Sequence, residues 1–181
     1  INYPNIDSTT IQNTQVTDVY IKMNAQISDK MEINGLFING GGLQINWCDT
    51  NPCVGISDTV YINNCHIMNK QTGNGATITE NVIAKFQNCI IENNFHGISS
   101  DNSDIIVIDS KINNNDAENE SGSAIMTNHY DRGSITIINT EITNNIGNNT
   151  IYISYNQTNN TESLVMDNVQ IENNEGSGIW S

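Results

Sequence analysis

A short pattern that returns seven times along the chain limits its fold more than any other feature. The pattern is an apolar residue, any residue, Asn or Asp, two further residues, an apolar residue, any residue, and again Asn or Asp. It is clearest as INNCHIMN from Ile62, FQNCIIEN from Phe86 and IINTEITN from Ile137. A repeat that is too short to form a domain of its own is typical of a solenoid, in which each repeat packs on its neighbours.

Aligned repeats place like residues in columns. The first polar column is predicted to form an asparagine ladder and consists of Asn13, Asn34, Asn64, Asn88, Asp109, Asn139 and Asn168. The second polar column, five residues later, consists of Asp18, Asn39, Asn69, Asn93, Asn114, Asn144 and Asn173. Between them lies an apolar column of Val16, Phe37, Ile67, Ile91, Ile112, Ile142 and Ile171. A further apolar column precedes the ladder by two residues, and Glu32 is its one polar member.

The spacing and composition of the columns predict the architecture. Successive ladder residues are 21 to 30 residues apart, and the apolar positions alternate as in strands. Ile outnumbers Leu, which favours stacked strands over leucine-rich repeats. Asn tolerates the left-handed backbone of sharp bends, and stacked Asn side chains can bond to one another. We therefore predict an all-β, right-handed parallel β-helix of about seven coils, forming a single domain over residues 1–181.

Sequence insertions are predicted to lie in one turn of each coil, after the second polar column. Examples are the CDTNPC loop from Cys48, the 115–123 loop and the 157–163 loop. After its loop the chain returns through a small residue and an apolar one. The returning steps are Gly97–Ile98, Ala124–Ile125, Thr150–Ile151 and Gly178–Ile179.

The repeat resembles the right-handed parallel β-helix repeat of the pectate-lyase-like superfamily. It is also similar to the repeats of polymorphic outer-membrane proteins, which pair a Gly-Gly-Ala-Ile-like step with a Phe-x-x-Asn segment. The corresponding segments here are Gly122-Ser123-Ala124-Ile125, Ile91-Glu92-Asn93-Asn94 and Ile171-Glu172-Asn173-Asn174. The likeness covers residues 11 to 180. It implies the fold but no single function, because that superfamily holds lyases, hydrolases, tailspikes and adhesins.

The four cysteines fall into two pairs. Cys48 and Cys53 flank a short segment, which suits a disulfide within a loop. Cys65 and Cys89 share a column on adjacent coils, which predicts either a disulfide between coils or two stacked buried thiols. A zinc site using His66 is disfavoured, because neighbours on a strand point to opposite faces. No metal and no cofactor is predicted.

Four Asn-x-Ser/Thr sequons predict glycosylation in or beside the loops of the last coils, at Asn119, Asn148, Asn156 and Asn159. Together with the predicted disulfides and an acidic surface, they favour an extracellular or cell-surface location. Chance sequons on an unglycosylated protein are the alternative.

The charge excludes several partners. Six basic residues stand against twenty acidic ones, for a net charge of −14. Nucleic acids are therefore not expected as partners, because their binding depends on Lys and Arg. No apolar run approaches 18 residues, so the described sequence predicts no membrane insertion.

The chain is predicted not to be an enzyme. The resemblance brings polysaccharide lyases and hydrolases into consideration, but their motifs are missing: Phe95-His96-Gly97 lacks the first Gly of Gly-His-Gly. The six basic residues also share no column beside paired Asp. Carboxylates from adjacent coils could still act as acid and base, and the two pairs considered are Glu92 with Asp109 and Glu141 with Glu172.

These observations predict a structural or adhesive surface protein: a rigid, glycosylated rod in a cell coat, appendage or filament. The expected partners are further copies or neighbouring β-helix segments, since open strand edges template association. A polysaccharide-active enzyme is one alternative. The other is a carbohydrate-binding β-helix, which requires exposed aromatic side chains such as Trp47 and Tyr152 along one face.

Overall fold

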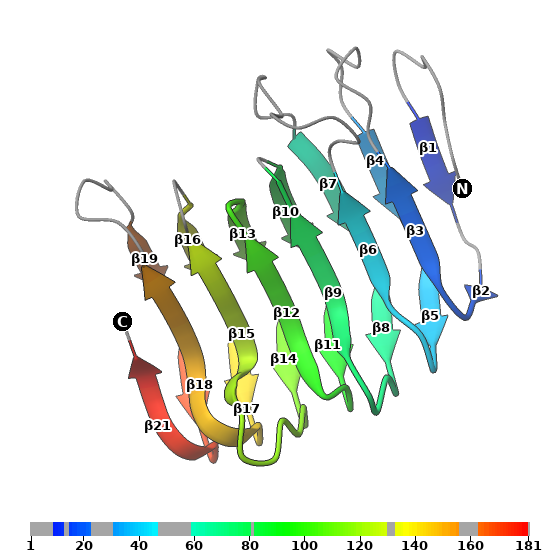
Figure 1. Ribbon diagram of the computed structural model, residues 1–181. Helices are drawn as coiled ribbons and strands as arrows, with labels where there is room; N and C mark the ends of the chain where they lie inside the picture. Colours follow the sequence, from blue (N-terminus) through cyan, green and yellow to red (C-terminus); the bar gives the residue numbers. More distant parts are fainter. Residues whose placement is uncertain are drawn as a thin grey trace.

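The computed structural model describes residues 9–12, 15–22, 31–46, 59–80, 82–129, 133–155 and 163–180. Over these residues the chain is all β, with no helix, and its strands form three parallel sheets of seven strands each. Each sequence repeat contributes one strand to each sheet, so the neighbours in a sheet come from successive repeats (Figure 1). The predicted parallel β-solenoid is thereby confirmed.

The sheets are numbered in the order in which each coil visits them. Sheet 1 contains β1 (Thr9–Gln12), β4 (Met31–Asn34), β7 (Thr59–Asn63), β10 (Ile83–Gln87), β13 (Asp104–Ile108), β16 (Ile135–Ile138) and β19 (Leu164–Asp167). Sheet 2 contains β2 (Gln15–Val16), β5 (Phe37–Asn39), β8 (His66–Met68), β11 (Ile90–Glu92), β14 (Lys111–Asn113), β17 (Glu141–Thr143) and β20 (Gln170–Glu172). Sheet 3 contains β3 (Val19–Lys22), β6 (Leu43–Asn46), β9 (Asn74–Thr79), β12 (His96–Asp101), β15 (Ser121–His129), β18 (Ile146–Tyr155) and β21 (Glu175–Trp180).

The hydrophobic core lies between the three sheets. Side chains alternate between buried and half-buried along the sheet 1 strands, because successive residues of a strand point to opposite faces. The inward column of sheet 1 is Ile33, Ile62, Phe86, Val107 and Ile137. That of sheet 2 is Ile38, Ile67, Ile91, Ile112 and Ile142. In sheet 3, Ile98, Ile125 and Ile151 are level with one another, as their returning steps predicted.

The second repeat is offset by one residue from its predicted alignment. Ile33, not Glu32, pairs with Ile62 in the core column, so the apparent polar exception disappears. Likewise Ile38 is fully buried and pairs with Ile67, whereas Phe37 is half-buried and faces outward. The reason is that Gly35 and Gly40 occupy the bend positions of this coil, where other coils have asparagine. An alignment based on asparagine therefore chose Asn34 and Asn39, each one residue too early.

A two-residue bend, the first corner, connects sheet 1 to sheet 2 in each described coil. Its first residue has a positive φ in every case: Gly35 (67°), Asn64 (54°), Asn88 (54°), Asp109 (50°), Asn139 (49°) and Asn168 (51°). Its second residue points inward, forming a column of Leu36, Cys65, Cys89, Ser110, Thr140 and Val169. Asn and Gly recur at the first position because they tolerate the left-handed backbone best.

Substitutions at Asn88 test the requirement for that backbone. Asn88 is exposed with a φ of 54°, so Asn88→Gly is expected to leave the free energy of unfolding nearly unchanged. Asn88→Val is expected to lower it by about 1–2 kcal/mol, because a β-branched residue is strained there. The matched control is Gln87→Val, one residue earlier in β10, which should be close to neutral. Equal losses from the two valine variants in urea unfolding would contradict this explanation.

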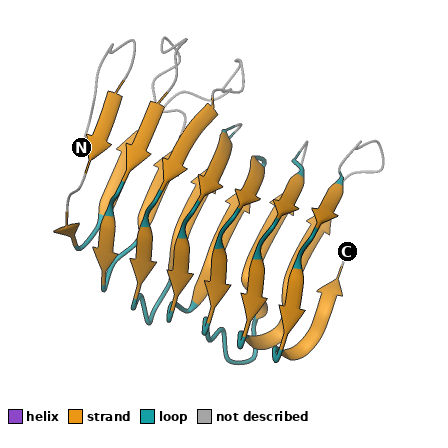
Figure 2. Ribbon diagram, turned by 180° about the vertical axis from the view of Figure 1, so that it is seen from behind, coloured by secondary structure: helices purple, strands orange, loops and turns teal. Residues whose placement is uncertain are grey.

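The two remaining connections vary in length. The second corner joins sheets 2 and 3 and also begins with a positive φ, at Gly40, Asn69, Asn93, Asn114, Asn144 and Asn173. The third corner returns the chain from sheet 3 to sheet 1 of the next coil (Figure 2). The prediction that insertions occupy a single turn is wrong. Residues 114–120 extend the second corner, whereas 47–58 and 156–163 fall between a sheet 3 strand and the next sheet 1 strand.

Candidate functional site

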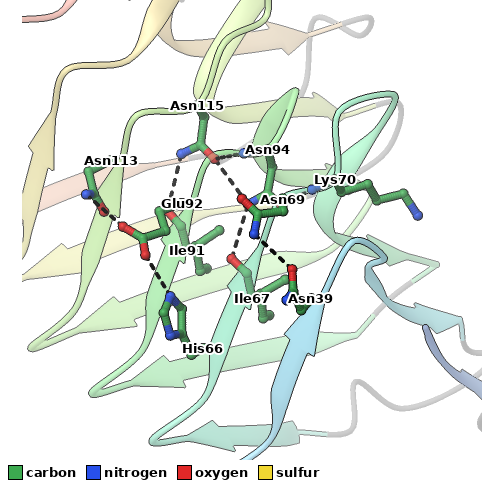
Figure 3. A network of polar contacts seen from close by, with 10 residues as sticks. All are labelled: Asn39, His66, Ile67, Asn69, Lys70, Ile91, Glu92, Asn94, Asn113 and Asn115. Atoms are coloured by element: carbon green, nitrogen blue, oxygen red, sulfur yellow. Dashed lines mark hydrogen bonds and ion pairs between the residues drawn. The ribbon is translucent and has the colours of Figure 1, made fainter. Parts of the chain in front are cut away.

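The most extensive polar network in the described residues is a column of four asparagines at the second corner: Asn94, Asn115, Asn145 and Asn174. Each follows the positive-φ residue of its corner and points inward (Figure 3 shows the first two). Asn115 and Asn145 have no exposed surface, and Asn94 is 2% exposed. We call this column the buried ladder.

The amides of Asn94, Asn115 and Asn145 bond in both directions along the stack, and Asn174 bonds to the preceding coil. Asn115 Nδ2 donates to Asn145 Oδ1 at 2.9 Å and to the carbonyl of Ile91 at 3.3 Å. Asn115 Oδ1 in turn accepts from the backbone N–H and from Nδ2 of Asn94, at 3.1 and 3.2 Å. Asn145 repeats the arrangement with Asn174 at 3.0 Å. The donors and acceptors are thereby paired, which removes the cost of burying an amide.

The buried ladder was not predicted as such. The second polar column was placed on Asn93, Asn114 and Asn144, whose side chains are half-buried or exposed, and the ladder lies one residue later. A signal was present, because Asn-Asn recurs at 93–94, 114–115, 144–145 and 173–174. The first Asn of each pair supplies the bend, and the second supplies the buried amide.

The ladder predicted at the first corner is present as side-chain contacts at the surface. Asn64 Nδ2 donates to Asn34 Oδ1 at 2.9 Å, and Asn139 Nδ2 donates to Asp109 Oδ1 at 3.0 Å. Asn168 Nδ2 donates to Asn139 Oδ1 at 3.0 Å. Asn34 joins through its side chain alone, because its backbone pairs with Asn63. Asn88 occupies the equivalent backbone position, and Asn13 lies outside the described residues.

A pair of titratable side chains, His66 and Glu92, lies on the outer face of sheet 2. His66 Nε2 is 2.8 Å from Glu92 Oε1, and Asn113 Nδ2 donates to Glu92 Oε2 at 3.2 Å (Figure 3). The ring of Phe37 packs edge-on against His66, with centroids 5.3 Å apart. An imidazole hydrogen-bonded to a carboxylate can act as a base. Here the carboxylate of Glu92 also accepts a hydrogen bond from the amide of Asn113.

The two carboxylate pairs considered for acid–base chemistry have other partners. Glu92 bonds to His66 and Asn113, whereas Asp109 accepts from Asn139. Glu141 forms an ion pair with Lys111 at 2.7 Å, and its neighbour in register on the next coil is Gln170, which is not an acid.

A shallow hollow opens on sheet 3 where it meets the second corner. Its polar lining is Asp18, Tyr20, Gln44, Lys70, Asn74 and Thr77. Asp18 Oδ1 accepts from the Gly42 N–H at 2.9 Å and lies 3.5 Å from Lys70 Nζ. The hydrogen bond from Gly42, assisted by the charge of Lys70, holds the pKa of Asp18 below its usual 3.8. The hollow therefore presents a carboxylate beside hydroxyl and amide groups.

The lowered pKa of Asp18 predicts a pH dependence. Its carboxylate adds stability that is fully present above the unfolded-state pKa and is lost as the pH falls through the lower folded-state pKa. Asp18→Asn should therefore reduce the loss of stability between pH 5 and 3 by a small amount, because this side chain is 68% exposed. Urea midpoints across that range measure the effect. A steeper acid loss in the variant than in the parent chain would contradict it.

Cys65 and Cys89 are free, buried thiols. Of the two arrangements that the sequence left open, the structure contains the two stacked thiols and no disulfide between them. Cys65 Sγ donates to the carbonyl of Asn63 and Cys89 Sγ to that of Ile62, both at 3.2 Å. The hydrogen bond with Cys65, together with burial, raises the pKa of the Cys89 thiol. Cys48 and Cys53 lie outside the described residues.

The thiol column predicts a tolerated substitution. Ser110 and Thr140 occupy the same inward position on the next two coils, where their hydroxyls donate to the carbonyls of Ile108 and Ile138. Cys89→Ser is therefore expected to cost no more than about 1 kcal/mol, since a hydroxyl can make the same bond. Cys89→Asp, which buries a charge, is the contrasting variant and should cost several-fold more. Equal unfolding midpoints for the two variants would contradict the assignment.

Two of the four sequons, at Asn119 and Asn148, lie within the described residues. Asn119 at the second corner and Asn148 in β18 are both exposed, and Asn148 Nδ2 donates to the carbonyl of Asn119. Thr150 of the Asn148 sequon is fully buried, so an enzyme can read that sequon only before β18 joins its sheet. Asn156 and Asn159 lie outside the described residues.

Aromatic side chains do not line one face in the described part of the chain. Tyr152 and Trp180 stack on each other at the end of sheet 3, with centroids 4.8 Å apart and planes 8° apart. Tyr20 lies at the opposite end of that sheet and is 40% exposed. Trp47 and Tyr130 lie outside the described residues.

Comparisons with known protein families, with curated proteins and with solved structures each found no match for this chain. The likeness to pectate-lyase-like and outer-membrane-protein repeats is therefore not supported by a family match, and the parallel β-solenoid is the description that stands. Among the described residues, no helix is long and apolar enough to cross a membrane. The same residues contain no group of three or more His, Cys, Asp or Glu side chains placed to hold a metal.

Proposed function

We propose that the chain is an extracellular structural protein, a rigid rod in a cell coat, appendage or filament. The observation that carries this proposal is the direction of its polar contacts. The buried ladder, the first-corner amides and the ion pairs of sheet 2 all connect residues of successive coils. A catalytic centre gathers such groups around one point, whereas here they run along the stack.

The same contacts support stiffness. Each coil is joined to the next by backbone hydrogen bonds in three sheets, and the corners add further bonds, such as Asn88 N–H to the carbonyl of Ile108 at 3.1 Å. Bending the rod requires several of these bonds to break together, since every coil contacts only its neighbours. A stiff spacer is useful where a surface must be covered or a ligand held away from it.

The location rests on composition and on the sequons. An acidic surface with a net charge of −14 favours solubility of such a rod. A glycan on the exposed Asn119 would project from the second corner without entering the core. Further copies of the chain or neighbouring β-helix segments are the partners of such a rod.

A second candidate is carbohydrate binding at the Asp18 hollow. Its carboxylate, amides and hydroxyls can bond to sugar hydroxyls, and Tyr20 borders them. We favour binding without catalysis at this hollow, because Asp18 is the one carboxylate among its described lining residues. Adhesion to a glycan and a structural role are compatible in one rod.

The test is to incubate the protein with a panel of plant, algal and microbial polysaccharides in the presence of calcium. Turnover is measured as the release of reducing ends and of unsaturated sugars. We expect no release at high protein concentration. Turnover of any polysaccharide would overturn the structural role. Binding of a glycan without turnover, lost in Asp18→Asn but kept in Asp104→Asn on sheet 1, would establish the second candidate.

A further inference from the structure

The outer face of sheet 1 changes character along the rod. The outward residues of its strands follow parallel columns, two of which run along most of the sheet. One of these is Glu32, Tyr61, Lys85, Ile106, Thr136 and Val165, and the other is Asn34, Asn63, Gln87, Ile108, Ile138 and Asp167. A third outward column at the start of the strands includes Thr59, Ile83 and Asp104, and the Asp104 carboxylate accepts from the hydroxyl of Ser134 at the edge of the sheet. The half nearer the N-terminus is polar and charged, whereas β13 and β16 present β-branched side chains side by side.

We call Ile106, Ile108, Thr136, Ile138 and Val165 the sheet 1 patch. The three isoleucines and Thr136 are half-buried, and Val165 is 48% exposed. None of the five carries a charge, in a chain with twenty acidic residues. Sheet 2 differs, because its exposed Ile90 stands between His66 and Lys111 in register. A contiguous apolar area on a flat face is typical of an interaction surface.

We propose that the sheet 1 patch binds the same patch of a second copy, with the two rods side by side and antiparallel. Flat sheets pack face to face, about 10 Å apart, when both faces are apolar. A two-fold axis parallel to the strands and midway between β13 and β16 sets Ile108 of one copy against Ile138 of the other. It also sets Ile106 against Thr136, so that the patch covers itself.

Charges at the rim of the patch fit this arrangement. Lys85 is one coil before Ile106, and Val165 and Asp167 are one coil beyond Thr136 and Ile138. The two-fold axis therefore brings Lys85 of one copy beside the β19 end of the other, where Asp167 is exposed. In the single chain, the Lys85 ammonium lies 5.8 Å from the ring centre of Tyr61. Each pair forms twice in the dimer.

The net charge of −14 on each copy opposes the pairing. Salt screens that repulsion over a Debye length of about 8 Å at physiological ionic strength. The dimer is consequently expected to become stronger as salt increases, which is the opposite of an interface held mainly by ion pairs.

The proposed dimer rests on the structural role proposed above, because its purpose would be to join rods side by side. The two ideas fail separately. A chain that stays monomeric would overturn the pairing, whereas turnover of a polysaccharide would overturn the structural role.

Sedimentation velocity over a range of protein and salt concentrations tests the pairing. We expect a monomer–dimer equilibrium that shifts toward dimer as salt rises. Ile138→Lys and Ile108→Lys should each weaken the dimer at least tenfold, and Ile90→Lys, an outward isoleucine on sheet 2, should leave it unchanged. Circular dichroism and urea midpoints confirm that each variant is folded.

A charge exchange tests the orientation. Lys85→Glu and Asp167→Lys should each weaken the dimer several-fold, and the double variant should restore it, because opposite charges are again neighbours across the axis. A monomer at every concentration and salt level would overturn the proposal. Equal effects of Ile90→Lys and Ile138→Lys, or no recovery in the double variant, would do so as well.

Discussion

Replacing Asn115 by alanine is expected to lower the free energy of unfolding by about 3–5 kcal/mol. Asn115 has no exposed surface, and its amide serves both neighbouring coils. Its loss leaves the backbone N–H of Asn94 and the carbonyl of Ile91 without these partners in a dry interior. Each buried group left unpaired costs about 1–3 kcal/mol. Urea unfolding followed by circular dichroism measures the change.

The adjacent residue provides the control. Asn114 precedes Asn115 at the same corner but is exposed with a φ of 55°. Asn114→Gly keeps that backbone and removes only a surface amide, so its expected cost is below about 0.5 kcal/mol. If Asn115→Ala unfolds at the same urea concentration as Asn114→Gly, the buried ladder does not hold the coils together.

Truncation of Phe86 is expected to have an effect of similar size. Phe86 is fully buried in the sheet 1 column between Ile62 and Val107. It is the largest fully buried side chain of the described residues. Phe86→Ala leaves a cavity that flanking coils cannot close, because their backbones are fixed in register. The expected loss is about 3–5 kcal/mol.

Ile83→Ala is the matched control for Phe86, since both residues belong to β10. Ile83 points outward and is half-buried, so its truncation is expected to cost about 1 kcal/mol or less. Phe86→Leu should recover part of the loss in Phe86→Ala, because it refills some of the cavity. A loss from Ile83→Ala as large as that from Phe86→Ala would contradict the assignment of the core to the inner columns.

The fold was predictable because each repeat carries the same local information. Ile62, Val107 and Ile137 recur at one position of the pattern and occupy one column of the core. Asn64 and Asn139 mark the bend because its backbone excludes most other residues. The alignment failed in the repeat where Gly35 makes that bend, since glycine meets the same requirement and leaves no side chain to recognise.

The polar interior could not be read in the same way. Asn93 and Asn94 are adjacent and identical in type, yet one makes the bend and the other is buried. The difference depends on the backbone direction after the corner, which a residue pattern does not specify. The pairing of Cys65 with Cys89 was correctly placed in one column, but shared position alone does not decide between thiols and a disulfide.

The outer-face contacts depended on geometry between coils of unequal length. His66 and Glu92 are 26 residues apart and meet diagonally, because Glu92 is level with Met68 and not with His66. The length of the coils varies most at their third corners, and these lengths do not fix which residues of β8 and β11 are level with each other. The carboxylate pairs drawn from sequence therefore missed the actual partner of Glu92.

Hydrogen exchange of the backbone amides tests most directly whether the polar residues of this chain serve to lock successive coils. The N–H groups of Asn94, Asn115 and Asn145 each donate to the side-chain Oδ1 of the next ladder residue. We predict that they exchange only through global unfolding, as slowly as the amides of the central sheet 1 strands. Exchange of these three amides at the rate of the exposed second-corner residues would contradict the role assigned to the buried ladder.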